Sequence, residues 1–297
     1  MKQLKVNVYF TGFEDEDGWF EEDYPASFPG NYDQDSPGGK DFADLAAILI
    51  ENKFREALMR FGSLFEKESP TTINIAINTY NAGSTVAAFR PLQYEGESSD
   101  HMYFVTSPLL LSAYLKSYWE NISLPEFYEY IWDHELVHFF DNSFKEQLDS
   151  DRLSSVSYLL KFRSEGIADL VFKLRNERPF AGIAQAREAF NDEFKHMINL
   201  SLNDAKALFR SVNQEIPYKF GPYMILHILG CMETSFCRNM FQKLEQGEEA
   251  FRDTEILQII QIALTISNAD FLKNLAEPGI NGAPFVEKED LIKYINR

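Results

Sequence analysis

Short stretches of alternating polar and apolar residues mark the first part of the chain. Residues 3–12 (QLKVNVYFTG) alternate with a period of two, the pattern of a strand with one buried face. Similar strand-like stretches follow at 72–80, 85–91 and 101–106. A helical periodicity occupies 41–68, whereas 14–40 is acidic and contains Gly and Pro, which is typical of a surface loop. The pattern predicts a small N-terminal sheet accompanied by a long helix.

Apolar residues recur at helical spacing through most of the remaining chain. One helix is predicted from the S-x-x-E capping box at Ser123 to about Phe144. Further helices are expected at 151–175, 181–198, 201–212, 222–245, 254–266 and 287–296. A sheet-bearing first half and a helical second half predict an α+β fold. We expect a mixed lobe over 1–145 and a helical lobe over 146–297.

Composition and charge narrow the class of protein. The 297 residues are 45% hydrophobic, which is enough for a large buried core. A net charge of -18 argues against nucleic acid as a partner, because phosphate binding needs clustered Lys and Arg. No apolar stretch approaches the roughly 18 residues of a membrane span, and the alternating N-terminus is unlike a signal peptide. With Cys231 and Cys237 interpreted as free thiols, a cytoplasmic location is expected.

The sequence H-E-L-V-H lies within the helix predicted from Ser123. His134 and His138 are four residues apart, so their imidazoles share one helical face and can reach a single ion. Glu135 lies one residue round from that face, where its carboxylate can act as a base toward water. Zinc suits imidazole and carboxylate ligands, and three protein ligands leave a position open for water. The alternative is a pair of hydrogen-bonded core histidines beside a buried ion pair.

A third metal ligand is needed, and its position separates the classes of metal site. A histidine six residues after His138 would indicate the metzincin pattern, but that position is Phe144. Asp141 is one alternative, one turn after His138. The preferred ligand is Glu165 in R-S-E-G-I-A-D on the next helix. Asp169 is expected not to bind the metal but to orient the imidazole of one of the histidines. The alternative for these two acids is an exposed pair on one helical face.

A glycine follows Glu165 directly, in the middle of the predicted helix. Glycine costs about 1 kcal/mol there relative to alanine, because it loses more backbone freedom on folding. Its presence at Gly166 is explained if a second helix approaches the backbone closely at this point. We therefore expect a helix crossing beside the third ligand.

H-E-L-V-H followed by E-G-I-A-D resembles the gluzincins, the group that includes thermolysin and the aminopeptidase-N-like enzymes. P-Y-K-F-G at 217–221 and the helix after it resemble the P-Y-x-x-G segment of the aminopeptidase branch. The resemblance covers about residues 125–245 and implies a zincin-like catalytic core with Zn²⁺. It also implies that Tyr218, placed before the Gly-Pro break at 221–222, supports the tetrahedral intermediate. Tyr223 and His227 remain alternative donors.

The resemblance has two departures. The connection between His138 and Glu165 is longer than in the aminopeptidase branch, and no G-x-M-E-N segment precedes the metal helix. Endopeptidase and exopeptidase activity therefore both stay open. Residues 101–106 are a candidate edge strand for pairing with an extended substrate.

The sequence thus predicts a zinc metallopeptidase that acts on a peptide or protein substrate, with its oligomeric state open. In its mechanism, Glu135 is the general base that accepts a proton from water and passes it to the leaving amine. Two alternatives come from other classes of function. One is a zincin-fold binding or regulatory protein without turnover, and the other is a zinc hydrolase with a non-peptide substrate.

Overall fold

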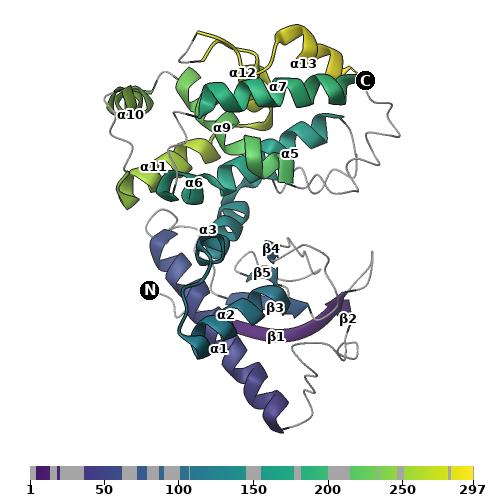
Figure 1. Cartoon of the computed structure of the whole chain (residues 1–297), viewed down its shortest axis with the longest axis vertical. Helices are drawn as coiled ribbons and strands as arrows, with labels where there is room; N and C mark the ends of the chain where they lie inside the picture. The colour runs from purple at the N-terminus through teal and green to yellow at the C-terminus, as the bar shows by residue number, and fades with distance from the viewer. Residues whose placement is uncertain are drawn as a thin grey trace. The chain divides into compact units, whose positions relative to one another are not determined.

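The structure is a computed structural model in which helices predominate and the strands form one small sheet, so the chain is α+β as predicted (Figure 1). It divides into two compact units, Met1–Phe139 and Phe140–Arg297. Among the residues described, no helix combines the length and apolar character needed to cross a membrane. The structure describes residues 5–13, 19–20, 37–61, 72–78, 87–89, 101–106, 108–144, 155–176, 182–199, 215–232, 234–245, 251–279 and 282–296.

Five strands of the first unit form one mixed sheet in the order β2-β1-β3-β5-β4. The three inner strands run parallel to one another, and the two outer strands are antiparallel to their neighbours. The strands are β1 (Lys5–Phe13), β2 (Trp19–Phe20), β3 (Thr72–Asn78), β4 (Ala87–Phe89) and β5 (His101–Thr106). The four predicted strands are confirmed. The expected loop over 14–40 falls largely outside the described residues, although β2 and the start of the first helix interrupt it.

The prediction that residues 101–106 form an edge strand is wrong. Strand β5 pairs with β3 on one side and, at Phe104–Thr106, with β4 on the other, so it does not lie at the edge of the sheet. Period-two alternation reveals which face of a strand is buried, but it carries no information about which strands lie beside it.

The central strand β3 shows why the sequence folds here as a buried strand. Ile73, Ile75 and Ile77 are each 0% exposed and share one face, as a period of two requires. On the other face, Asn74 accepts a hydrogen bond of 2.8 Å from Asn7, its register partner in β1. The two asparagine side chains thus hydrogen-bond to each other across two parallel strands.

The described residues of the first unit also form three helices. They are α1 (Pro37–Phe61), α2 (Pro108–Glu120) and α3 (Glu126–Phe140), the last ending earlier than predicted. Three aromatic rings join α1, β5 and α3. The Phe54 ring centroid is 4.8 Å from that of Phe104 and 5.3 Å from that of Trp132, in edge-to-face contacts. Because Trp132 is two residues before His134, this core fixes the helix that carries the histidines.

All the secondary-structure elements that the structure describes in the second unit are helices. Its helices are α5 (Ser155–Ala168), α6 (Leu170–Asn176), α7 (Ile183–Asn199), α9 (Glu215–Cys231), α10 (Ser235–Glu245), α11 (Asp253–Leu264), α12 (Asn268–Leu275) and α13 (Lys288–Ile295). The single helix expected over 151–175 is interrupted at Asp169, and the one expected over 222–245 is two helices. Helix α12 was not predicted. The helix expected at 201–212 lies outside the described residues.

Phe190 on α7 is the centre of the second unit's aromatic core. It is 0% exposed, and four other phenylalanine rings surround it at centroid distances of 5.3–5.8 Å. These are Phe162 on α5, Phe194 on α7, Phe220 on α9 and Phe285 near the C-terminus. The cluster packs α5 and α9 against a common neighbour.

Helices α5 and α9 also meet backbone to backbone at a pair of glycines. A Cβ added to Gly166 would lie 2.4 Å from the carbonyl carbon of Gly221, and one added to Gly221 would lie 2.5 Å from the carbonyl oxygen of Phe162. Neither position has room for a side chain. The expected close approach of a second helix at Gly166 is confirmed, and it lies one residue from Glu165.

We predict that Gly221→Ala lowers the free energy of unfolding by about 1–3 kcal/mol, as overpacking of a tight contact typically does. Without the close contact, the same change would stabilise a helix by about 1 kcal/mol, because alanine loses less backbone freedom. The two cases therefore differ in sign. Denaturant unfolding of the whole chain measures the effect, with Lys219→Ala at an exposed position of the same helix as the control. A more stable Gly221→Ala protein would contradict the crossing geometry.

Candidate metal centre

The two histidines of α3 face each other at hydrogen-bonding distance. The Nε2 atoms of His134 and His138 are 3.0 Å apart, and the ring planes are inclined by 80°. The side chains are 7% and 4% exposed. One turn of helix separates the two residues, so the spacing in sequence places both imidazoles on the same face. The predicted pairing of the two histidines is confirmed.

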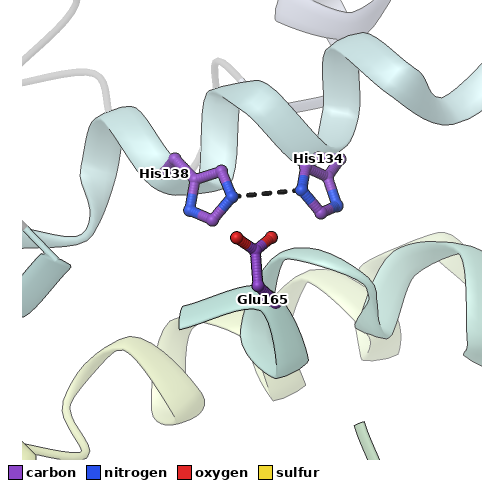
Figure 2. Close-up of side chains that lie close together, drawn as sticks. All are labelled: His134, His138 and Glu165. Carbon is purple, nitrogen blue, oxygen red and sulfur yellow. Dashed lines mark hydrogen bonds between the residues drawn. The ribbon is translucent and has the colours of Figure 1, made fainter. Parts of the chain in front are cut away.

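The carboxylate of Glu165 on α5 completes a group of three metal-ligating side chains. One ligand atom from each of His134, His138 and Glu165 lies within 4.8 Å of the other two. Figure 2 shows the two imidazoles of α3 turned toward one another and the Glu165 carboxylate directed at the space beside them. Glu165 is 7% exposed. Within the described part of the chain, this is the one group of three or more such residues that fits a metal ion.

The geometry of this group suits a bound metal ion. Two nitrogen ligands of a tetrahedral ion, each bound at about 2.0–2.1 Å, lie roughly 3.3–3.4 Å apart. The observed 3.0 Å between the Nε2 atoms is a few tenths of an ångström shorter. A small rotation of either ring closes that difference. Two imidazoles and one carboxylate are a donor set that several divalent metals accept.

Two further predicted residues are close to this group in sequence. Glu135 is 3% exposed on α3, next to His134, and its place outside the group agrees with a role other than ligand. Asp169 is 8% exposed and lies at the turn between α5 and α6, where its backbone nitrogen donates to the carbonyl of Glu165 at 2.9 Å. Its role behind an imidazole stays a prediction.

Asp141, the alternative third ligand, has a different partner. Its carboxylate receives the guanidinium of Arg163, with Nη1 2.7 Å from Oδ2. Both side chains are buried, and Asp141 is not a member of the group that fits a metal. The opposite charges of the two residues are visible in the sequence, but at a separation of 22 residues their spacing does not reveal the pair.

A second arginine holds the acidic residue just before His134. Asp133 is 0% exposed, and Arg60 at the end of α1 donates to it from Nη2 at 2.8 Å and from Nε at 3.1 Å. Such a two-pronged bond fixes orientation as well as distance. The start of the histidine motif is thereby attached to α1.

Tyr218 lies inside helix α9, not before it as predicted. The helix begins at Glu215 and continues through Pro222 to Cys231. Pro217 falls in the first turn, where a missing N–H costs nothing, and Pro222 removes one internal hydrogen bond that the packing on α5 offsets. Tyr218 is half-buried and three residues before Gly221. It therefore shares the helical face that meets α5 beside Glu165.

His227, an alternative donor, is engaged elsewhere in the second unit. Its ring is 3% exposed, and its Nε2 lies 3.1 Å from the carbonyl oxygen of Glu277. A Cβ added to Gly279 would lie 2.4 Å from Nδ1, so the loop backbone covers the ring. Burial lowers the pKa of His227, which favours a neutral ring donating from Nε2. The other alternative, Tyr223, is half-buried with the Nζ of Lys173 5.7 Å from its ring centroid.

Comparison of the chain with models of protein families, with curated proteins and with solved structures finds no match. The interpretation of the site therefore depends on its own residues and geometry.

We predict that the purified protein binds about one divalent metal ion per chain and that Glu165→Ala loses it. Removing one of three ligands leaves a pair of imidazoles that holds an ion far less tightly. Elemental analysis after gel filtration measures the stoichiometry, and a chelator should lower the melting temperature of the parent but not that of Glu165→Ala. Glu188→Ala, an exposed carboxylate on α7, is the matched control. Full occupancy in Glu165→Ala would exclude Glu165 as a ligand.

Proposed function

We propose that this protein is a zinc-dependent peptidase with a zincin-like catalytic core. The observation that carries the proposal is the buried group of His134, His138 and Glu165, with a further buried carboxylate, Glu135, between the two histidines in sequence. Three protein ligands leave room for a water and a substrate, which is typical of a catalytic site. When bound, zinc supplies Lewis acidity that activates water and polarises the scissile carbonyl.

Charge balance supports a divalent ion at this place. Glu135 and Glu165 are two buried carboxylates, whereas His134 and His138 are neutral in the form that binds metal. Buried charges are costly unless they are compensated. A divalent ion would bring a compensating positive charge to the point where the ligand atoms of His134, His138 and Glu165 converge.

Two residues of the chain carry out proton transfer and stabilise the negative charge that develops on the substrate. Glu135 accepts a proton from the attacking water and passes it to the leaving amine, as a general base and then a general acid. Tyr218 donates a hydrogen bond to the oxygen that becomes negatively charged when water adds to the carbonyl. Peptides and proteins are the substrates, because the resemblance in sequence lies with enzymes of that class. A neutral or basic peptide is favoured by the net charge of -18.

We predict that Glu135→Gln abolishes peptide hydrolysis while the metal stays bound. Glutamine keeps the shape of the side chain but cannot accept the proton, and general base catalysis contributes typically about 10²–10⁴-fold. The measurement pairs cleavage of a mixed peptide pool, followed by mass spectrometry, with metal stoichiometry. Glu129→Gln, an exposed carboxylate on the same helix, is the control.

Activity of Glu135→Gln within a few-fold of the parent would rule out this mechanism. A parent that holds zinc but cleaves no peptide in the pool would instead favour a binding protein or a non-peptide substrate.

We predict that Tyr218→Phe reduces kcat by about 10²–10³-fold with little change in KM, the usual cost of one oxyanion donor. The hydroxyl acts mainly when charge develops on the substrate, so ground-state binding changes little. Tyr223→Phe, on the same helix, should be close to the parent. Steady-state kinetics, metal content and melting temperature separate a chemical effect from a structural one. Nearly normal kcat in Tyr218→Phe would assign the role to another donor.

A further inference from the structure

The buried ion pair of Arg163 and Asp141 is supported by several additional hydrogen bonds. Arg163 donates to both carboxylate oxygens, at 2.7 Å from Nη1 and 3.1 Å from Nη2, and its Nε donates to the carbonyl of Ile266 at 2.7 Å. Asp141 also accepts from the backbone nitrogen of Phe144 at 3.2 Å. The two side chains are 0% and 1% exposed. Each partner is thus held by the other and by backbone.

The pair joins the two segments that carry metal ligands. Asp141 is three residues after His138, directly beyond the end of α3, and Arg163 is two residues before Glu165 on α5. Two residues of a helix span about 3 Å along its axis, so α5 moves Arg163 and Glu165 together. On the other side of Glu165, Gly166 is locked against α9. The third ligand therefore lies between two closely fixed points.

We propose that the Arg163–Asp141 pair positions Glu165 for metal binding, and so governs affinity for the ion more than the stability of the fold. The proposal rests on the proposed metal site. Residues that support a metal ligand orient it, and their loss typically weakens the affinity for the metal. A two-pronged bond between a guanidinium and a carboxylate fixes both distance and angle.

Energetics separate this role from simple stabilisation. Two charges lose their hydration when buried, and replacing such a pair with apolar side chains of similar size is often neutral or stabilising. A merely structural pair can therefore be replaced without loss at the metal site. A positioning pair cannot, because apolar side chains no longer fix the distance and angle between the end of α3 and the part of α5 that precedes Glu165.

The chain contains a matched control for the experiment. Arg60 and Asp133 form a similar two-pronged pair on the histidine helix, but this pair attaches α3 to α1. We compare the double variants Asp141→Leu/Arg163→Met and Asp133→Leu/Arg60→Met with the parent. Two quantities are measured on the whole chain. They are the dissociation constant for Zn²⁺ by chelator competition and the melting temperature of the metal-free protein.

The expected result is a dissociation constant about 10–100-fold weaker for Asp141→Leu/Arg163→Met, the range found when residues supporting metal ligands are removed. Its metal-free melting temperature should differ from the parent by no more than that of the control double variant, whose affinity should stay within about two-fold. Unchanged zinc affinity in Asp141→Leu/Arg163→Met overturns the proposal. So does an equal loss of affinity in both double variants.

Arg163→Lys decides the case if the double variant does not fold. Lysine keeps the positive charge opposite Asp141, but its ammonium group lacks the planar pair of N–H donors with which a guanidinium binds both carboxylate oxygens. Zinc affinity about ten-fold weaker supports the positioning role, and parent-like affinity overturns it. A parent that binds zinc but cleaves no peptide removes the proposed function while this comparison stands, whereas a parent with no zinc affinity overturns both.

Discussion

Helix α3 buries charged and polar side chains that a protein interior accepts only when each has a partner. Asp133, within the helix, forms an ion pair with Arg60. Asp141, just beyond the C-terminal end of the helix, forms an ion pair with Arg163. Between these pairs the two imidazoles meet each other and the Glu165 carboxylate. The arginines thereby compensate the charges of the two flanking acids. The polar side chains of the helix that can hold a metal ion are thus the two histidines, which lie together with Glu165.

The sequence was sufficient for features that depend on local spacing. Strand β3 alternates isoleucine with polar residues, and its identity follows from that alternation alone. The histidine pair follows from a spacing of four on a helix. Gly166 was informative because glycine inside a helix needs an external reason, and the backbone of Gly221 is that reason. The donor group of the site could therefore be assembled from motifs in two segments.

Features that depend on partners distant in the chain were missed. Nothing in residues 101–106 reveals that β4 lies beside them, because pairing in a sheet is decided by the whole unit. Helix α9 runs through Pro222, since packing against α5 outweighs one lost hydrogen bond. Asp141 was weighed as a ligand because its nearness in sequence to His138 was visible, whereas Arg163, its partner, is 22 residues away. Local propensity and spacing cannot rank such alternatives.

The contact between Gly166 and Gly221 has a consequence for how the second unit opens. Hydrogen exchange and proteolysis act through local unfolding, and segments with few close contacts unfold first. Helix α5 has no slack at Gly166, because its backbone touches that of α9. Separating the two helices would also expose the phenylalanine cluster around Phe190. Glu165 is therefore carried by a segment that unfolds with the core of its unit, and its amide should be among the slow exchangers of that unit.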